Sequence, residues 1–181
     1  MRFKVFSIVA MLATAAIAIA QTPDPAIDKA LLAAPAQMRA GATVVKWKKD
    51  FTYDTLRKGT NRLACYERPE QPGGPMFSVE CTSIANLERV SQSLKTETVD
   101  AKDRRAAFEA MEMAGKWTKP EFGSIFYNLS GADQATARSH ATICVPGATT
   151  QTLGLPDTAT QGGAWIINAG TSAAHLMMPG H

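Results

Sequence analysis

Apolar and polar side chains alternate along the first part of the chain, from residue 42 to residue 81. Val45 and Trp47 fall on one side of an extended backbone, and lysines occupy the positions between and after them. After a short polar break, Phe51 and Tyr53 continue the alternation. A period of two is typical of a strand that has one covered face. The region is therefore predicted to form strands.

Two turn signals divide this region. In the first, Gly59 is expected to supply a positive φ and Asn61 to bond its own backbone. The second is a Pro/Gly loop over residues 69–75, which leads into an alternating run that begins at Phe77. Strand runs joined by short turns favour antiparallel neighbours. The pattern predicts a four-stranded antiparallel meander over residues 42–81.

The hydrophobic period becomes helical in two later stretches, about 83–95 and 101–115. In the first stretch Leu87 and Leu94 share one face, while Arg89 falls among the charged residues assigned to the outer face. The second stretch again collects apolar residues on one side, and a glycine follows it as a stop. Two amphipathic helices are therefore predicted.

The last third of the chain returns to short apolar runs separated by Gly, Ser, Thr, Asp and Pro. These runs predict strands over residues 122–129, 141–145, 164–168 and 174–178. Strands, two helices and then strands suit an α+β fold on an antiparallel sheet, because alternating βαβ units are missing from the pattern. We expect one α+β domain over residues 41–181, preceded by an N-terminal arm or short helix within residues 21–40.

Residues 1–20 have the pattern of a secretory signal peptide. Arg2 and Lys4 precede an apolar run that ends in small residues, and polar residues begin at Gln21. The apolar run is shorter than a membrane-spanning helix requires, and no later segment is apolar enough to span a bilayer. The predicted location is the periplasm or the exterior of the cell.

The charge balance gives no indication of a nucleic-acid partner. The whole chain has 19 Lys plus Arg against 16 Asp plus Glu. Removing residues 1–20 would remove Arg2 and Lys4, so the remaining chain would be close to neutral. Neither nucleic acid nor an anionic membrane surface is predicted to bind such a chain through charge.

The three cysteines, Cys65, Cys81 and Cys144, all follow the predicted leader. Export would place them in a compartment where disulfides persist. Cys65 and Cys81 lie on two strand runs joined by the Pro/Gly loop, and they are predicted to form a disulfide. Cys144 lies between two β-branched residues, and it is interpreted either as a buried inert thiol or as a reactive or intermolecular one.

The familiar catalytic and nucleotide-binding motifs are missing from the sequence. It contains no P-loop, GxGxxG, HExxH, CxxC or GxSxG. The best local candidate for chemistry is the C-terminal segment, where His175 and Met177 would project from the same face of a strand. Imidazole and thioether suit copper, and His181 or His140 would complete the site. In the alternative interpretation, the leucine and methionines of this segment fill the core and His175 makes one structural hydrogen bond.

Three functional hypotheses follow. The first is a non-enzymatic module that binds a small ligand or an envelope protein and needs no cofactor, with Trp47, Phe51, Tyr53 and Trp165 as its apolar lining. The second hypothesis, copper binding, is a more specific form of the first. The third hypothesis is a hydrolase whose site is assembled from distant residues that include His140 or His175. A hydrolase would need a histidine within hydrogen-bond reach of a carboxylate or hydroxyl.

The segment from Leu56 to Cys65 carries a Leu-x-x-Gly-Thr-Asn-x-x-x-Cys pattern, and a second cysteine, Cys81, follows the Pro/Gly loop. In these features the chain resembles a group of small exported bacterial proteins of unassigned function. The resemblance also includes residues 33–35 and 42–44 and, more loosely, the runs at 122–129 and 175–179. It implies an exported single-domain protein, and it implies no activity.

Overall fold

The computed structural model describes residues 24–159 and 163–178. The predicted signal peptide and His181 lie outside these residues. The α+β class is confirmed, because one eight-stranded, mostly antiparallel sheet packs against helices. The strands are β1 (Thr43–Trp47), β2 (Tyr53–Arg57), β3 (Leu63–Glu67), β4 (Phe77–Ser83), β5 (Ile125–Gly131), β6 (Arg138–Cys144), β7 (Trp165–Ile167) and β8 (His175–Met178).

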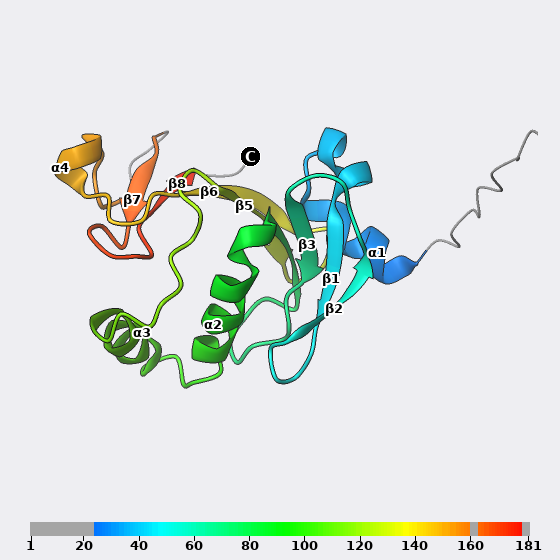
Figure 1. The fold of residues 1–181 in the computed structure, drawn as a ribbon, viewed down its shortest axis with the longest axis horizontal. Helices are drawn as coiled ribbons and strands as arrows, with labels where there is room; N and C mark the ends of the chain where they lie inside the picture. Colours follow the sequence, from blue (N-terminus) through cyan, green and yellow to red (C-terminus); the bar gives the residue numbers. More distant parts are fainter. Residues whose placement is uncertain (1–23, 160–162, 179–181) are drawn as a thin grey trace, which may run out of the picture.

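The sheet order is β2-β1-β3-β4-β5-β6-β8-β7, which differs from the predicted meander in one place (Figure 1). Strand β3 pairs with β1 in parallel, with Val44 opposite Cys65, instead of pairing with β2. Because β1 therefore has a neighbour on each side, β2 lies at the edge of the sheet. The other pairings are antiparallel.

The turn at Gly59 joins β2 to β3 and brings β3 beside β1. Its backbone geometry differs from the predicted one. Gly59 is not among the residues with a positive φ. A Cβ atom on Gly59 would lie 2.3 Å from the carbonyl oxygen of Gly41, so the residue permits a close approach of two backbone segments. The Thr60 and Asn61 amides both donate to that oxygen, at 2.8 and 2.9 Å. The Asn61 side chain accepts from the Leu63 amide at 2.9 Å, as predicted.

Phe51 is a second local difference. The alternation placed it on a strand, but it adopts a φ of +62° in the loop between β1 and β2. Strand β2 begins only at Tyr53. The Phe51 carbonyl accepts a hydrogen bond from Ser91 at 2.8 Å, and this contact holds the loop against a helix.

The N-terminal arm consists of short helices that cover one face of the sheet. They are α1 (Pro25–Ala30), η1 (Leu31–Ala33) and η2 (Ala36–Gly41). Asp24 caps α1 by accepting from the Ala26 amide at 2.9 Å. Ala30 and Leu31 pack against Val44, Cys65 and Cys81 in a closed core.

The opposite face of the same strands is covered by α2 (Leu87–Glu97), which follows the turn η3 (Ile84–Asn86). Val45, Ala64 and Tyr66 pack there against Leu87 and Leu94. Neighbouring residues of one strand thus serve different cores, as alternation requires. The prediction for Arg89 was wrong, because this α2 residue is 7% exposed and lies on the inner side of the helix.

Helix α3 (Arg104–Met113) lies beside α2 on the same side of the sheet, and α4 (Thr150–Leu153) lies near β7 (Figure 1). The Glu112 carboxylate holds α3 to the segment before β8 by accepting from the Ser172 amide at 2.8 Å and from its hydroxyl at 2.5 Å. Burial opposes the charged form of Glu112, but these two bonds and nearby Arg89 outweigh it and lower the pKa of the carboxyl.

The predicted disulfide between Cys65 and Cys81 is confirmed. The two residues are directly opposite each other on β3 and β4, and both are fully buried. Cys144 is buried and unpaired in the described chain. None of the helices in residues 24–159 and 163–178 is long and apolar enough to cross a membrane.

Candidate functional site

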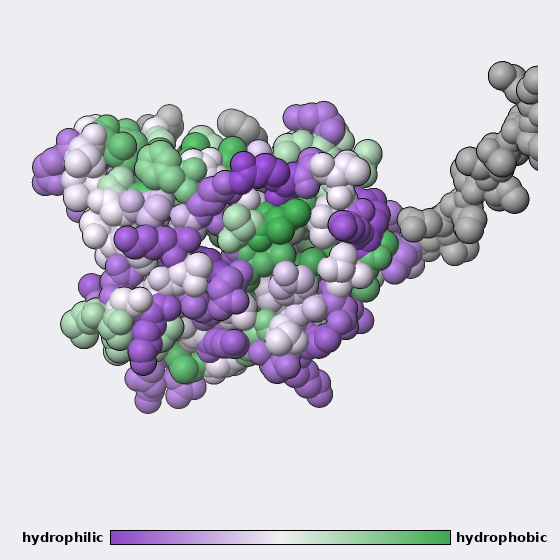
Figure 2. Space-filling view, in the orientation of Figure 1, coloured by the Kyte–Doolittle hydropathy of each residue, from purple (hydrophilic) through white to green (hydrophobic). Residues whose placement is uncertain are grey.

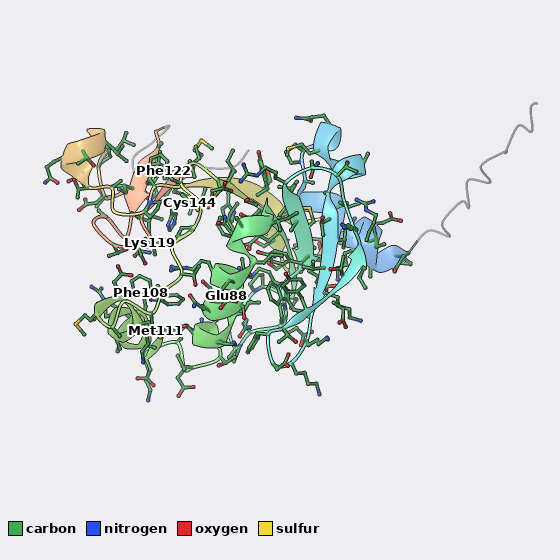
Figure 3. The ribbon with its side chains drawn as sticks, viewed as in Figure 1. Glu88, Phe108, Met111, Lys119, Phe122 and Cys144 are labelled. Atoms are coloured by element: carbon green, nitrogen blue, oxygen red, sulfur yellow. A yellow bond between two sulfur atoms is a disulfide. The ribbon has the colours of Figure 1, made fainter. Side chains whose placement is uncertain are left out.

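A cavity of about 490 Å³ lies between the sheet and the helices α2 and α3, and we call it the sheet–helix cavity. Its walls come from β4, β5, β6 and β8 on one side and from the two helices on the other. Figure 2 shows the surface hollowed between the helices and the β7–β8 end of the sheet. In Figure 3, Phe108 on α3 and Cys144 at the end of β6 lie across this hollow from each other.

The strand register places a row of polar residues on the cavity side of the sheet. Tyr66 is opposite Glu80, Glu80 is opposite Asn128, and Asn128 is opposite His140. Residues opposite each other on neighbouring strands project from the same face. The last three of these residues line the cavity, whereas Tyr66 lies beneath α2.

A buried ionic network forms one end of the cavity. The Tyr66 hydroxyl donates to Glu80, and Arg68 donates to Glu80 at 3.1 Å and to Glu97 at 2.5 Å. Burial raises the pKa of Tyr66 well above its ordinary value, and the Glu80 carboxylate raises it further. Burial opposes the charge of Arg68, but the two carboxylates outweigh it and raise the pKa of the guanidinium. This network fixes β3, β4 and α2 relative to one another.

The cavity also contains most of the side chains that the sequence suggested as metal ligands. His140, His175 and Met177 line it, together with Cys144, which is opposite His175 in the β6–β8 pairing. Within the described chain, no three His, Cys, Asp or Glu residues are grouped closely enough to hold a metal ion. His140, Cys144 and His175 share the cavity without forming such a group, and the carboxylates of Glu80 and Glu97 line the same cavity.

The hydrogen bonds of these histidines bear on the hydrolase hypothesis. His175 Nδ1 is 2.8 Å from the carbonyl oxygen of Ala173. Among the hydrogen bonds of the described residues, none joins His140 or His175 to a carboxylate or a hydroxyl. Burial lowers the pKa of His140, and it raises the pKa of the Cys144 thiol. The hydrolase hypothesis gains no observation in its favour from this arrangement.

The four aromatic residues suggested as ligand lining lie elsewhere. Trp47 packs edge-on against Tyr53 and Tyr66, with ring centroids 5.4 and 5.5 Å apart. Trp47 and Phe51 line a second hollow next to the Pro/Gly loop, whereas Tyr53 is exposed on the edge strand. Trp165 is opposite Met177, on the outermost strand. None of the four lines the sheet–helix cavity.

The sequence did not indicate the aromatic and cationic lining of this cavity. Phe108 and Trp117 face it, with ring centroids 5.5 Å apart, and Phe126 lines it from β5. Arg89 lies over the Trp117 ring, 4.1 Å from its centroid, and Arg104 also lines the cavity. The one available signal was Trp117 itself, a large aromatic residue in the polar segment between the second predicted helix and the next strand.

Comparisons of the chain with protein-family models, with curated proteins and with solved structures find no match.

Proposed function

We propose that this protein is an exported, non-enzymatic binding module that takes a small ligand into the sheet–helix cavity. The observation that carries the proposal is the cavity itself. It lies between two layers of secondary structure, and its volume of about 490 Å³ is in the range of small-molecule sites. Its lining combines aromatic rings with a few charged and hydrogen-bonding groups, which is the usual composition of such sites.

Three features support export. Residues 1–20 have the signal-peptide pattern, the Cys65–Cys81 disulfide suits an oxidising compartment, and the Leu56–Cys65 pattern resembles small exported bacterial proteins.

The experiment measures binding of phenylnaphthylamine, an uncharged dye that fluoresces in apolar surroundings. We expect saturable binding to the full chain with micromolar affinity. Ser93 lines the cavity from α2, so Ser93→Trp would fill part of the space and weaken binding by about tenfold or more. Glu88→Trp adds the same side chain to the exposed face of the same helix and should leave the affinity unchanged.

Two results would contradict the proposal. One is a native protein that does not bind the dye at all. The other is equal affinity in the two tryptophan variants, because the dye would then occupy some other surface. Thermal unfolding of both variants is recorded first, so that a loss of binding is compared only between folded proteins.

Copper binding is the second candidate, and the shared position of His140, His175 and Met177 in one cavity favours it. Imidazole and thioether ligands suit copper, and the thiol of Cys144 lies on the same face. Cuprous and cupric ions titrated into the full chain should bind about tenfold more tightly than to a His175→Ala variant. Equal affinity for both proteins would remove this candidate.

A further inference from the structure

Arg89 is a buried cation whose hydrogen-bonding capacity is mostly unused. The residue is 7% exposed, and its guanidinium stacks on Trp117 in the wall of the sheet–helix cavity. A guanidinium has five N–H donors. In residues 24–159 and 163–178, Arg89 donates one hydrogen bond, from Nη1 to the Thr118 carbonyl oxygen at 3.3 Å. Burial lowers its pKa, but an arginine still remains charged near neutral pH.

The carboxylates near Arg89 are engaged with other groups. Glu112 is the one whose charge acts on Arg89, and both of its oxygens accept hydrogen bonds from Ser172. Glu80 and Glu97 form ion pairs with Arg68. No carboxylate of the described residues lies within salt-bridge distance of Arg89. A buried charge without a direct ion-pair partner is costly, which makes the site favourable for an anion that enters from outside.

A second arginine gives the cavity a net positive lining. Arg104 of α3 donates to two backbone carbonyls, those of Val99 at 3.2 Å and Pro72 at 2.8 Å, and forms no ion pair with the described carboxylates. The lining contains three arginines and two glutamates, so with neutral histidines its formal charge is +1. Arg68 can neutralise only one of its two glutamate partners, so this ion-pair network has a surplus of negative charge. The net positive charge of the lining therefore comes from Arg89 and Arg104.

The remaining walls near Arg89 are apolar. Trp117 lies under the guanidinium, Phe108 is tilted against Trp117, and Phe126 lines the cavity from the sheet. The Trp117 ring lies against the guanidinium, whose unused N–H donors can form two parallel hydrogen bonds to one anionic group. An apolar body attached to that group would contact the aromatic side chains.

We infer that the ligand of the sheet–helix cavity is a small organic anion, with a carboxylate, sulfonate or phosphate group bound by Arg89 and an apolar, preferably aromatic, body against Phe108 and Phe126. This inference rests on the proposed function. It adds the charge and shape of the ligand to the proposal that the cavity binds one.

The test compares two probes with the same aromatic frame, uncharged phenylnaphthylamine and anionic anilinonaphthalene sulfonate. Both are titrated into the full chain and into Arg89→Gln. We expect the variant to bind the sulfonate about tenfold or more weakly, the loss typical of a charge-assisted hydrogen bond, and to bind the uncharged probe with nearly native affinity. Arg105→Gln removes the same charge from an exposed position on α3 and should change neither affinity.

Arg89→Lys separates the effect of the positive charge from the effect of the guanidinium fork. The lysine keeps the positive charge and loses the fork, so we expect sulfonate affinity between those of the native protein and Arg89→Gln. The inference is overturned if Arg89→Gln weakens both probes equally, or if it weakens the sulfonate no more than Arg105→Gln does. In those cases the uncharged probe can still bind the native cavity, and the proposed function stands. Failure of the uncharged probe with native protein removes the proposed function itself.

Discussion

Replacing Arg68 by methionine should lower the free energy of unfolding by about 3–5 kcal/mol, the cost of removing one partner from a buried ion pair. Glu80 is 4% exposed, and after the substitution its charge would keep only the Tyr66 hydroxyl as a partner. Glu97 would also lose its partner, but it is less buried. Urea unfolding measures the change, with a constant slope as evidence that the transition remains two-state.

A double variant and a surface control make this result specific. Arg68→Met/Glu80→Gln removes the unpaired charge and keeps an acceptor for Tyr66, so it should recover most of the lost stability. Arg105 forms an exposed pair with Glu109, and Arg105→Met should leave the midpoint of urea unfolding nearly unchanged. If Arg68→Met costs no more than Arg105→Met, the network does not stabilise the fold.

Removing the disulfide with Cys65→Ala/Cys81→Ala should destabilise the protein by about 3 kcal/mol, because the two cysteines are 16 residues apart and the bridge restricts a loop of that size in the unfolded chain. Urea unfolding of the oxidised native protein and of the variant gives the difference. The binding of phenylnaphthylamine should survive in the folded variant, since neither cysteine lines the cavity.

Cys144→Ala is the matched control for the loss of a buried sulfur without the loss of a cross-link. Cys144 is 4% exposed and unpaired, so its replacement should cost about 1 kcal/mol. A double variant no less stable than this control would show that the bridge adds little to stability.

The sequence predicted the elements better than their pairing. Alternation of apolar residues located the strands before residue 82, short apolar runs located the later ones, and the Pro/Gly loop between two cysteine-bearing strands indicated the disulfide that the structure contains. The parallel pairing of β1 with β3 was missed because it depends on the close approach of Gly59 to Gly41, a contact between segments that periodicity does not describe. Phe51 had the right chemistry for a strand, but it occupies a left-handed loop position.

The candidate site could be predicted only in part. His140, His175 and Met177 line the cavity, and the two-residue spacing of His175 and Met177 was sufficient to place them on one face. Arg89 was missed because a charged residue in an amphipathic helix is usually solvated. Its burial depends on Trp117, which lies 28 positions later in the chain and reaches Arg89 only in the folded protein.

The N-terminal arm gives the disulfide a protection that does not depend on the strength of the bond. Ala30 and Leu31 close over the two sulfur atoms, and the Cys81 sulfur is 3.7 Å from the Ala30 carbonyl oxygen. A thiolate must reach one of these sulfur atoms to attack it. Reductants such as glutathione would therefore reach the bridge only after the arm detaches from the sheet. The rate of bridge cleavage would then report how often this end of the molecule opens.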